Sequence, residues 1–182
     1  MSFIAHAISP GLTVVGGDFE PPFFETVVLS SFTDTITKTT RADGKKVKQN
    51  RIGVVITSLT YTGTITGGKV QFTADGGATW KTAAADYSRA YFDQDGQVLP
   101  GTADGIPVLI NTVPAFVSFE IHGMGLLVPT MVRAADMTVS TSHVNQIAGM
   151  SRAAETHDGF RIILTGTSVD ITGGTMYVGY FD

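Results

Sequence analysis

The chain has 182 residues, no cysteine and a formal net charge of −4 at pH 7. This length suits one domain with its own core and no disulfide, and the mild negative charge gives no reason to expect nucleic acid as a partner. The first residues lack a basic region followed by an apolar run, and no apolar run approaches about 18 residues, so neither a signal peptide nor a transmembrane span is expected. Abundant Thr and Gly favour strands and turns over helices.

Residues 1–24 are predicted to form an extended arm. Pro10-Gly11, Gly16-Gly17 and Pro21-Pro22 interrupt regular structure. Three phenylalanines nevertheless make the segment too apolar for a free tail: Phe19, Phe23 and Phe24. The arm should therefore lie against either its own domain or a neighbouring chain, and the residues leave both possibilities open.

A strand and a basic turn are predicted next. ETVVLSSFTDTIT (25–37) has the composition of a strand, and Asp43-Gly44 is a strong hairpin signal. The segment around the turn gathers five basic residues: Arg41, Lys45, Lys46, Lys48 and Arg51. It predicts either a basic hairpin that contacts an acidic neighbour or phosphates, or a solvated hairpin whose lysines discourage edge pairing.

Alternating apolar residues predict strands in RIGVVITSLTYTGTI (51–65) and GGKVQF (67–72), with turns at Gly67-Gly68 and Gly173-Gly174. The next stretch, TADGGATW (73–80), predicts a hairpin held by its own side chains. Asp75 can accept hydrogen bonds from N–H groups of the turn, two glycines supply positive φ, and Trp80 can fold back under the turn. The structural residues of this hairpin are Thr73, Asp75, Gly76, Gly77, Thr79 and Trp80.

Residues 82–114 are predicted to form a long loop rich in Asp, Gly and Pro, and loops of this kind often bind or contact partners. If the loop binds glycans, its aromatic residues Tyr87, Tyr91 and Phe92 would stack on sugar rings. Alternatively, these residues anchor the loop or an intersubunit contact. The second interpretation needs no ligand and is preferred.

The C-terminal part is predicted to return to strands. AFVSFEIHG (115–123) alternates cleanly, MTVSTS (137–142) is a short strand, SHVNQIAGMS (142–151) holds one or two helical turns, and FRIILTG, SVDIT and TMYVGYFD (160–182) are strands. The last strand is apolar on both faces, which indicates burial on both, by its own domain or by another subunit. With the arm, it predicts an interface of eight residues: Phe19, Phe23, Phe24, Met176, Tyr177, Val178, Tyr180 and Phe181.

Catalytic and metal sites are not expected. The histidines His122, His143 and His157 lack metal-ligand spacing, and the sequence carries no nucleophile motif or phosphate-binding loop. The sequence therefore predicts no enzyme activity, no metal and no cofactor.

TADGGATW matches the Asp-box of sialidases, but sialidases repeat this element on several propeller blades and need an arginine cluster, whereas this chain has one copy and scattered arginines. The wider segment YTGTITGGKVQFTADGGATWKTA (61–83) resembles a segment that recurs in tailed-phage virion proteins. Similar segments occur in capsid decoration proteins, tail-tube and fibre proteins, and carbohydrate-binding sandwiches. The resemblance covers residues 61–83 only, and it implies a virion β-sandwich without choosing its place in the particle.

The predicted fold is all-β: an antiparallel, jelly-roll-like β-sandwich over residues 25–182 with an extended N-terminal arm over 1–24. The first functional hypothesis is a non-enzymatic capsid decoration, or cement, protein. It would stabilise a virion, assembled in the host cytoplasm, by contacts with its own copies as a trimer and with other virion proteins such as the major capsid protein, without binding a membrane. The alternatives are a tail-fibre or carbohydrate-binding module that recognises a host surface glycan, and a tail-tube or adaptor component.

Overall fold

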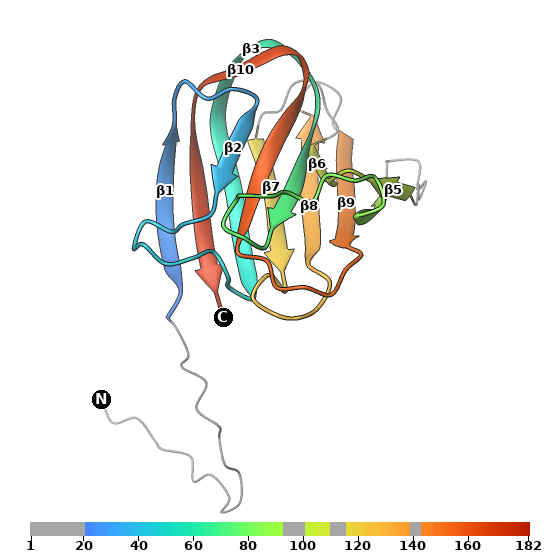
Figure 1. The fold of residues 1–182 in the computed structure, drawn as a ribbon. Coiled ribbons are helices and arrows are strands. Elements are labelled where there is room, and N and C mark those ends of the chain that lie inside the picture. The colour runs from blue at the N-terminus through green and yellow to red at the C-terminus, as the bar shows by residue number, and fades with distance from the viewer. Residues whose placement is uncertain (1–20, 93–100, 110–115, 139–142) are drawn as a thin grey trace, which may run out of the picture.

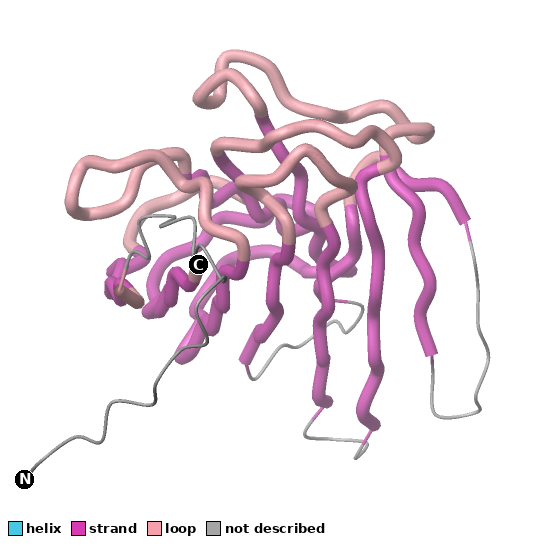
Figure 2. Tube along the Cα trace, turned by 90° about the horizontal axis from the view of Figure 1, so that it is seen from below, coloured by secondary structure: helices cyan, strands magenta, loops and turns pink. Residues whose placement is uncertain are grey.

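The computed structural model of the chain describes residues 21–92, 101–109, 116–138 and 143–182. Every regular element in these ranges is a β-strand, as Figure 2 shows, and they contain no helix that could span a membrane. The prediction of an all-β fold is confirmed. The strands are β1 (Phe23–Leu29), β2 (Thr35–Lys38), β3 (Arg51–Thr73), β4 (Tyr87–Phe92), β5 (Gly101–Ala103), β6 (Ile106–Leu109), β7 (Phe116–His122), β8 (Met131–Thr138), β9 (His143–Ser151) and β10 (Gly159–Phe181).

Two long antiparallel strands, β3 and β10, connect the two halves of the architecture. They pair with each other from Arg51 opposite Phe181 to Thr73 opposite Gly159. The first half of β3 and the second half of β10 belong to a large layer in the order β1-β10-β3-β7-β8-β9-β4-β5. The first part of β10 pairs with β2 and the last part of β3 with β6, and these strands form a second, smaller layer. Figure 1 shows both long strands bending over the top of the molecule, so their halves belong to two facing layers.

The bend lies where the two long strands lose regular pairing. Register shifts interrupt the β3–β10 ladder between residues 165 and 175, and Gly63 and Ser168 have φ of 75° and 51°. A Cβ on Gly63 would overlap the carbonyl oxygen of Ser168, so the close approach requires glycine. The turns predicted at Gly67-Gly68 and Gly173-Gly174 are wrong, because both pairs lie inside the long strands, where glycine allows bulges and close packing.

The hydrophobic core fills the space between the layers. The strand predicted at 115–123 is confirmed, and Val117, Phe119 and Ile121 point inward while the residues between them point outward. The edge of the Phe119 ring meets Phe160 of the smaller layer, with centroids 6.4 Å apart. Burying each such side chain stabilises the fold by about 1.5–3 kcal/mol. Further buried residues are Ile36, Ile52, Val54, Ile56, Val70, Phe72, Ile106, Val108, Ile162, Met176, Val178 and Tyr180.

Three predicted elements differ from the structure. The strand expected at 25–37 is divided into β1 and β2 by residues 30–34, where Ser31 has φ of 56°. The loop expected at 82–114 contains β4, β5 and β6, and the helical turns expected at 142–151 are strand β9. Pairing with distant strands decides these cases, since β9, for example, lies between β8 and β4. A local sequence pattern carries little information about such partners.

Most of the predicted arm, residues 1–20, lies outside the described residues. Pro21 and Pro22 are exposed and precede the sheet. β1 begins at Phe23, so Phe23 and Phe24 belong to a strand and not to the arm.

Candidate interaction surface

The outer side of the large layer is apolar where β1, β10 and β3 lie side by side. Because side chains alternate along a strand, the residues between the buried positions point away from the core. Phe24, Val28 and Tyr177 are 67%, 71% and 49% exposed, and Tyr177 lies opposite Val55 in the β10–β3 register. We name the set Phe24, Val28, Val55, Tyr177 and Phe181 the apolar face.

Two glycines let the aromatic rings of this face lie close to the sheet. A Cβ on Gly179 would come within 3.0 Å of the rings of both Phe24 and Phe181, and one on Gly53 would touch Phe181. The two rings meet edge to face, with centroids 5.5 Å apart. A shallow depression of about 360 Å³ over these strands has Phe24, Val55, Tyr177 and Phe181 of the apolar face in its lining. Contiguous exposed apolar surface of this kind is typical of a contact site.

The apolar face has a free strand edge on one side and a charged border on the other. Within the described ranges, no strand pairs with the outer edge of β1. On the other side, Arg51 donates to Glu120 at 2.6 Å and lies over the Phe181 ring, 5.1 Å from its centroid. The hydrogen bond from Arg51 lowers the pKa of Glu120, and His122 Nε2 lies 3.3 Å from the same carboxylate. The border is therefore paired within the chain.

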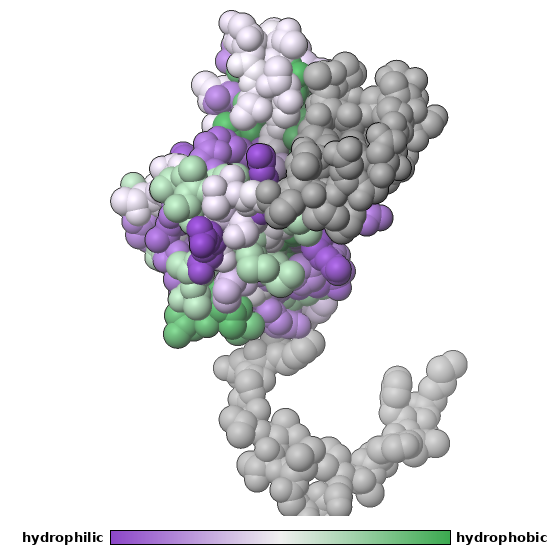
Figure 3. All heavy atoms as spheres, turned by 90° about the vertical axis from the view of Figure 1, so that its right-hand side faces the viewer, coloured by the Kyte–Doolittle hydropathy of each residue, from purple (hydrophilic) through white to green (hydrophobic). Residues whose placement is uncertain are grey.

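A second group of exposed apolar side chains lies in the loop between β7 and β8 and on the strands beside it. Figure 3, in which the right-hand side of Figure 1 faces the viewer, shows hydrophobic side chains at the lower edge of the molecule. The exposed residues are Leu126, Leu127, Val128, Met131 and Met150. None of these residues lies in the strands that form the apolar face. Leu127 is 73% exposed and is therefore a suitable control position for substitutions in the apolar face.

Part of the predicted interface lies in the core of the chain itself. Met176, Val178 and Tyr180 are buried between the layers, so their side of the last strand is covered by its own domain and is closed to another subunit. Phe23 is half-buried against Tyr180, with ring centroids 6.0 Å apart. Phe19 lies outside the described residues. The predicted residues that belong to the apolar face are Phe24, Tyr177 and Phe181.

A buried polar network holds the inner side of β1. The carboxylate of Glu25 accepts hydrogen bonds from Lys38 at 2.8 Å, from the backbone N–H of Ala42 at 2.7 Å and from the Tyr180 hydroxyl. Burial, and then the hydrogen bond to Glu25, raises the pKa of Tyr180. The network fixes β1 on the domain and therefore positions Phe24.

Several of the predicted basic contact residues form ion pairs within the chain. The pairs are Arg41 with Asp43 at 2.5 Å, Lys46 with Asp158 at 2.6 Å and Arg51 with Glu120 at 2.6 Å. Arg41 is also buried, so it cannot contact a partner. These pairs leave the segment less basic toward solvent than the sequence predicts.

The TADGGATW stretch forms a turn held by its own side chains directly after β3. Asp75 accepts a hydrogen bond from the Thr73 hydroxyl at 2.7 Å and from the Thr79 N–H at 2.9 Å. The Thr79 hydroxyl contributes most to lowering the pKa of Asp75. The two glycines have φ of 73° and 97°, as the sequence predicts. The guanidinium of Arg161 lies 4.6 Å from the centroid of the Trp80 ring.

Sequence reasoning missed the residue that anchors this turn, Asp158. Its carboxylate accepts hydrogen bonds from the Gly76 N–H at 2.8 Å and from Lys46 at 2.6 Å. Burial alone would raise the pKa of Asp158, but these hydrogen bonds outweigh burial and lower it. The adjacent His157 is fully buried, with Nδ1 2.7 Å from the Thr130 hydroxyl oxygen. Gly76 and Asp158 are 82 residues apart, so no local motif signals the contact.

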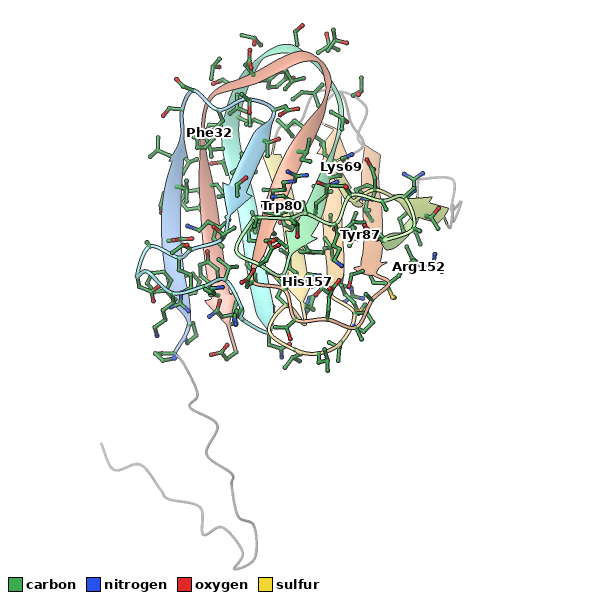
Figure 4. The ribbon with its side chains drawn as sticks, in the orientation of Figure 1. Phe32, Lys69, Trp80, Tyr87, Arg152 and His157 are labelled. Atoms are coloured by element: carbon green, nitrogen blue, oxygen red, sulfur yellow. The ribbon has the colours of Figure 1, made fainter. Side chains whose placement is uncertain are left out.

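Tyr87, which is labelled in Figure 4, is fully buried. It therefore cannot take part in the predicted glycan contact. Its hydroxyl accepts a hydrogen bond from the Phe72 N–H at 3.0 Å and donates one to the Lys81 carbonyl at 3.1 Å, and burial raises its pKa. The side chains of Tyr91 and Phe92 lie outside the described part of the chain. Within the described part, no group of three or more His, Asp or Glu residues could hold a metal ion, and the side chain of His143 lies outside it.

No protein-family model matches the chain, and no curated protein matches it. Two solved structures align with 98% of this chain at 8% identity: infectious bursal disease virus, Gt strain, with a TM-score of 0.14, and the VP2 subviral particle of infectious bursal disease virus, with a TM-score of 0.12. The chain spans 46% and 45% of the length of those chains. TM-scores this low support no conclusion about fold or function.

Proposed function

We propose that this chain is a structural subunit that acts by burying surface against its own copies and neighbouring proteins, and that it catalyses no reaction. The observation that carries the proposal is the apolar face, with its exposed Phe24, Val28 and Tyr177. Soluble monomers rarely expose large contiguous apolar patches, and such patches usually mark protein contacts.

The free edge of β1 supports the same function. β1 has the sequence FFETVVL, with no proline or lysine. An exposed apolar strand edge without such protection is a template for pairing with another chain. The only charged residue of β1 is Glu25, which is buried in the polar network and so does not protect the edge.

We further propose that the assembly is a virion and that the chain is a capsid decoration, or cement, protein. The support is the resemblance of residues 61–83 to tailed-phage virion proteins. In the structure this segment is the end of β3 and the turn anchored by Asp158. Interface burial in a decoration protein would add stability to a shell. The glycan-binding alternative is weaker, because Tyr87 is buried.

Sedimentation velocity of the full chain over a range of concentrations tests the proposal. We expect a homo-oligomer, and we expect Tyr177→Asp to shift it toward monomer, because a carboxylate buried in an apolar contact is strongly unfavourable. Leu127→Asp is the matched control, since Leu127 is at least as exposed but lies outside the apolar face. Circular dichroism verifies that both variants fold. A wild-type chain that stays monomeric at all concentrations contradicts the proposal.

A further inference from the structure

We propose that the apolar face and the free edge of β1 receive residues 1–20 of a second copy of this chain. The inference rests on the proposed function, because it names the occupant of the surface through which the subunit assembles. It also specifies which parts of the two copies meet: the N-terminal segment of one copy and the sheet of the other.

The point at which residues 1–20 end places them beside this surface. They lead through Pro21 and Pro22 into Phe23, which pairs with Tyr180, and the next residue, Phe24, belongs to the apolar face. Twenty extended residues span at most about 66–72 Å. That reach is ample for a neighbouring subunit in contact with the large layer.

The composition of the segment suits this surface. It carries Phe3, Ile4 and Phe19 and the run Leu12–Val15, LTVV, which is rich in β-branched residues. Such a run is suited to pair with an open strand edge through its backbone while alternate side chains cover an apolar face. The run is short enough to match the seven residues of β1.

The two prolines favour a neighbouring copy over the chain's own face. Each proline fixes φ near −65° and lacks an N–H, so neither Pro21 nor Pro22 can donate a backbone hydrogen bond to the β1–β10 ladder. A Pro-Pro pair favours the stiff polyproline II conformation. A stiff pair directly before β1 disfavours the tight reversal that would return residues 1–20 to the apolar face of their own sheet.

Such a donation joins two different surfaces, the terminal segment of one copy and the apolar face of another. When it is reciprocal between two copies it forms a two-fold dimer, and otherwise it is a heterologous contact. Heterologous contacts close into a ring when the rotation between subunits allows it. Each subunit then donates one segment and receives one, and no apolar face is left exposed.

Thiol cross-linking of the full-length chain tests the exchange, because the natural sequence has no cysteine. Thr13→Cys lies in the LTVV run, and Thr26→Cys lies on β1 at an exposed position opposite Tyr177. The two variants carry tags of different size and are mixed, unfolded and refolded together, and treated with a short bismaleimide. Thr167→Cys, exposed at the bend, replaces Thr26→Cys as the matched control.

We expect a mixed product of both tags at least about tenfold above the Thr167→Cys control, because docking raises the local thiol concentration toward the millimolar range. Adding Tyr177→Asp to the Thr26→Cys chain should abolish the excess. A mixed yield no higher than the control, or a Thr13→Cys/Thr26→Cys double variant that cross-links only within a monomer, overturns the inference. In either case an oligomeric wild-type chain would leave the proposed function standing, whereas a monomeric one would refute both.

Discussion

His157 should make the stability of the domain depend on pH. Its side chain is fully buried, Nε2 has no hydrogen-bond partner in the described part of the chain, and Glu155 Oε1 lies 3.5 Å away. Burial lowers the pKa of His157, and the nearby Glu155 opposes this only in part. The unfolded chain therefore binds a proton more readily than the folded one. The resulting stabilisation is complete above the ordinary histidine pKa of about 6.5 and is lost as the pH falls toward the folded value.

We accordingly expect the unfolding temperature to fall between about pH 7.5 and pH 5, and His157→Gln to remove a large part of that slope. His122→Gln is the control, because it leaves the buried imidazole in place. Thermal unfolding followed by circular dichroism measures all three chains. Equal slopes in wild type and His157→Gln would contradict the prediction. Asp158 and Lys81, which also act on His157, are unchanged in both variants.

Residue roles follow from the sequence only where the partners are near in the chain. The bond from the Thr79 N–H to Asp75 spans four residues, and the sequence predicts that Asp75 accepts such bonds. Tyr87 is predicted either to contact a glycan or to anchor the loop or an intersubunit contact. Its actual partner, the Phe72 N–H, is not predicted, because that contact depends on how β3 and β4 are placed. Val28 is missed as a contact residue, since which face of β1 is exposed depends on its register with β10.

At the level of elements, the bend of β3 and β10 should depend on Gly63. A left-handed backbone at a non-glycine residue costs about 1–2 kcal/mol, and forcing a Cβ against the Ser168 carbonyl adds about 1–3 kcal/mol. We expect Gly63→Ala to lower the free energy of unfolding by about 2–5 kcal/mol. Gly44 has φ of 85° and open space around it, so Gly44→Ala should lower the free energy of unfolding only by the cost of the left-handed backbone. Urea unfolding measures both variants, and an equal loss would refute the role of the bend.

The same two strands show why the elements were only partly predictable. Strands of 23 residues are far longer than usual, and their glycine pairs are typical of turns between shorter strands. The segments TGTITGG and DITGG are not ends of separate hairpins, because they lie in the part of β3 and β10 that pairs across the bend. By contrast, β7 is predicted well, since its alternation is unbroken and one face is apolar throughout.

At the level of the whole molecule, charges pair inside the chain while apolar side chains remain outside it. Arg41, Lys46 and Arg51 each have a carboxylate partner within the domain. The all-β class follows from composition and alternation. The position of the apolar face does not, because it depends on which long-range pairings place β1 beside β10. The sequence shows both a basic turn and apolar residues near the N-terminus. In the structure, basic residues of the turn form ion pairs within the chain, whereas Phe24 and Val28 of β1 stay exposed.

This difference predicts how assembly responds to salt. Raising NaCl from about 0.05 M to about 0.5 M shortens the screening length roughly threefold, which weakens contacts between exposed charges. Burial of the apolar face is not screened, and excluded salts such as sulfate strengthen it. We therefore expect the oligomer to persist at high NaCl and to strengthen in ammonium sulfate, as measured by sedimentation velocity. Lys45→Gln/Lys48→Gln, which removes charge from the basic turn, should assemble like wild type. Dissociation at high NaCl, or in this double variant, would show that the basic turn and not the apolar face joins the subunits.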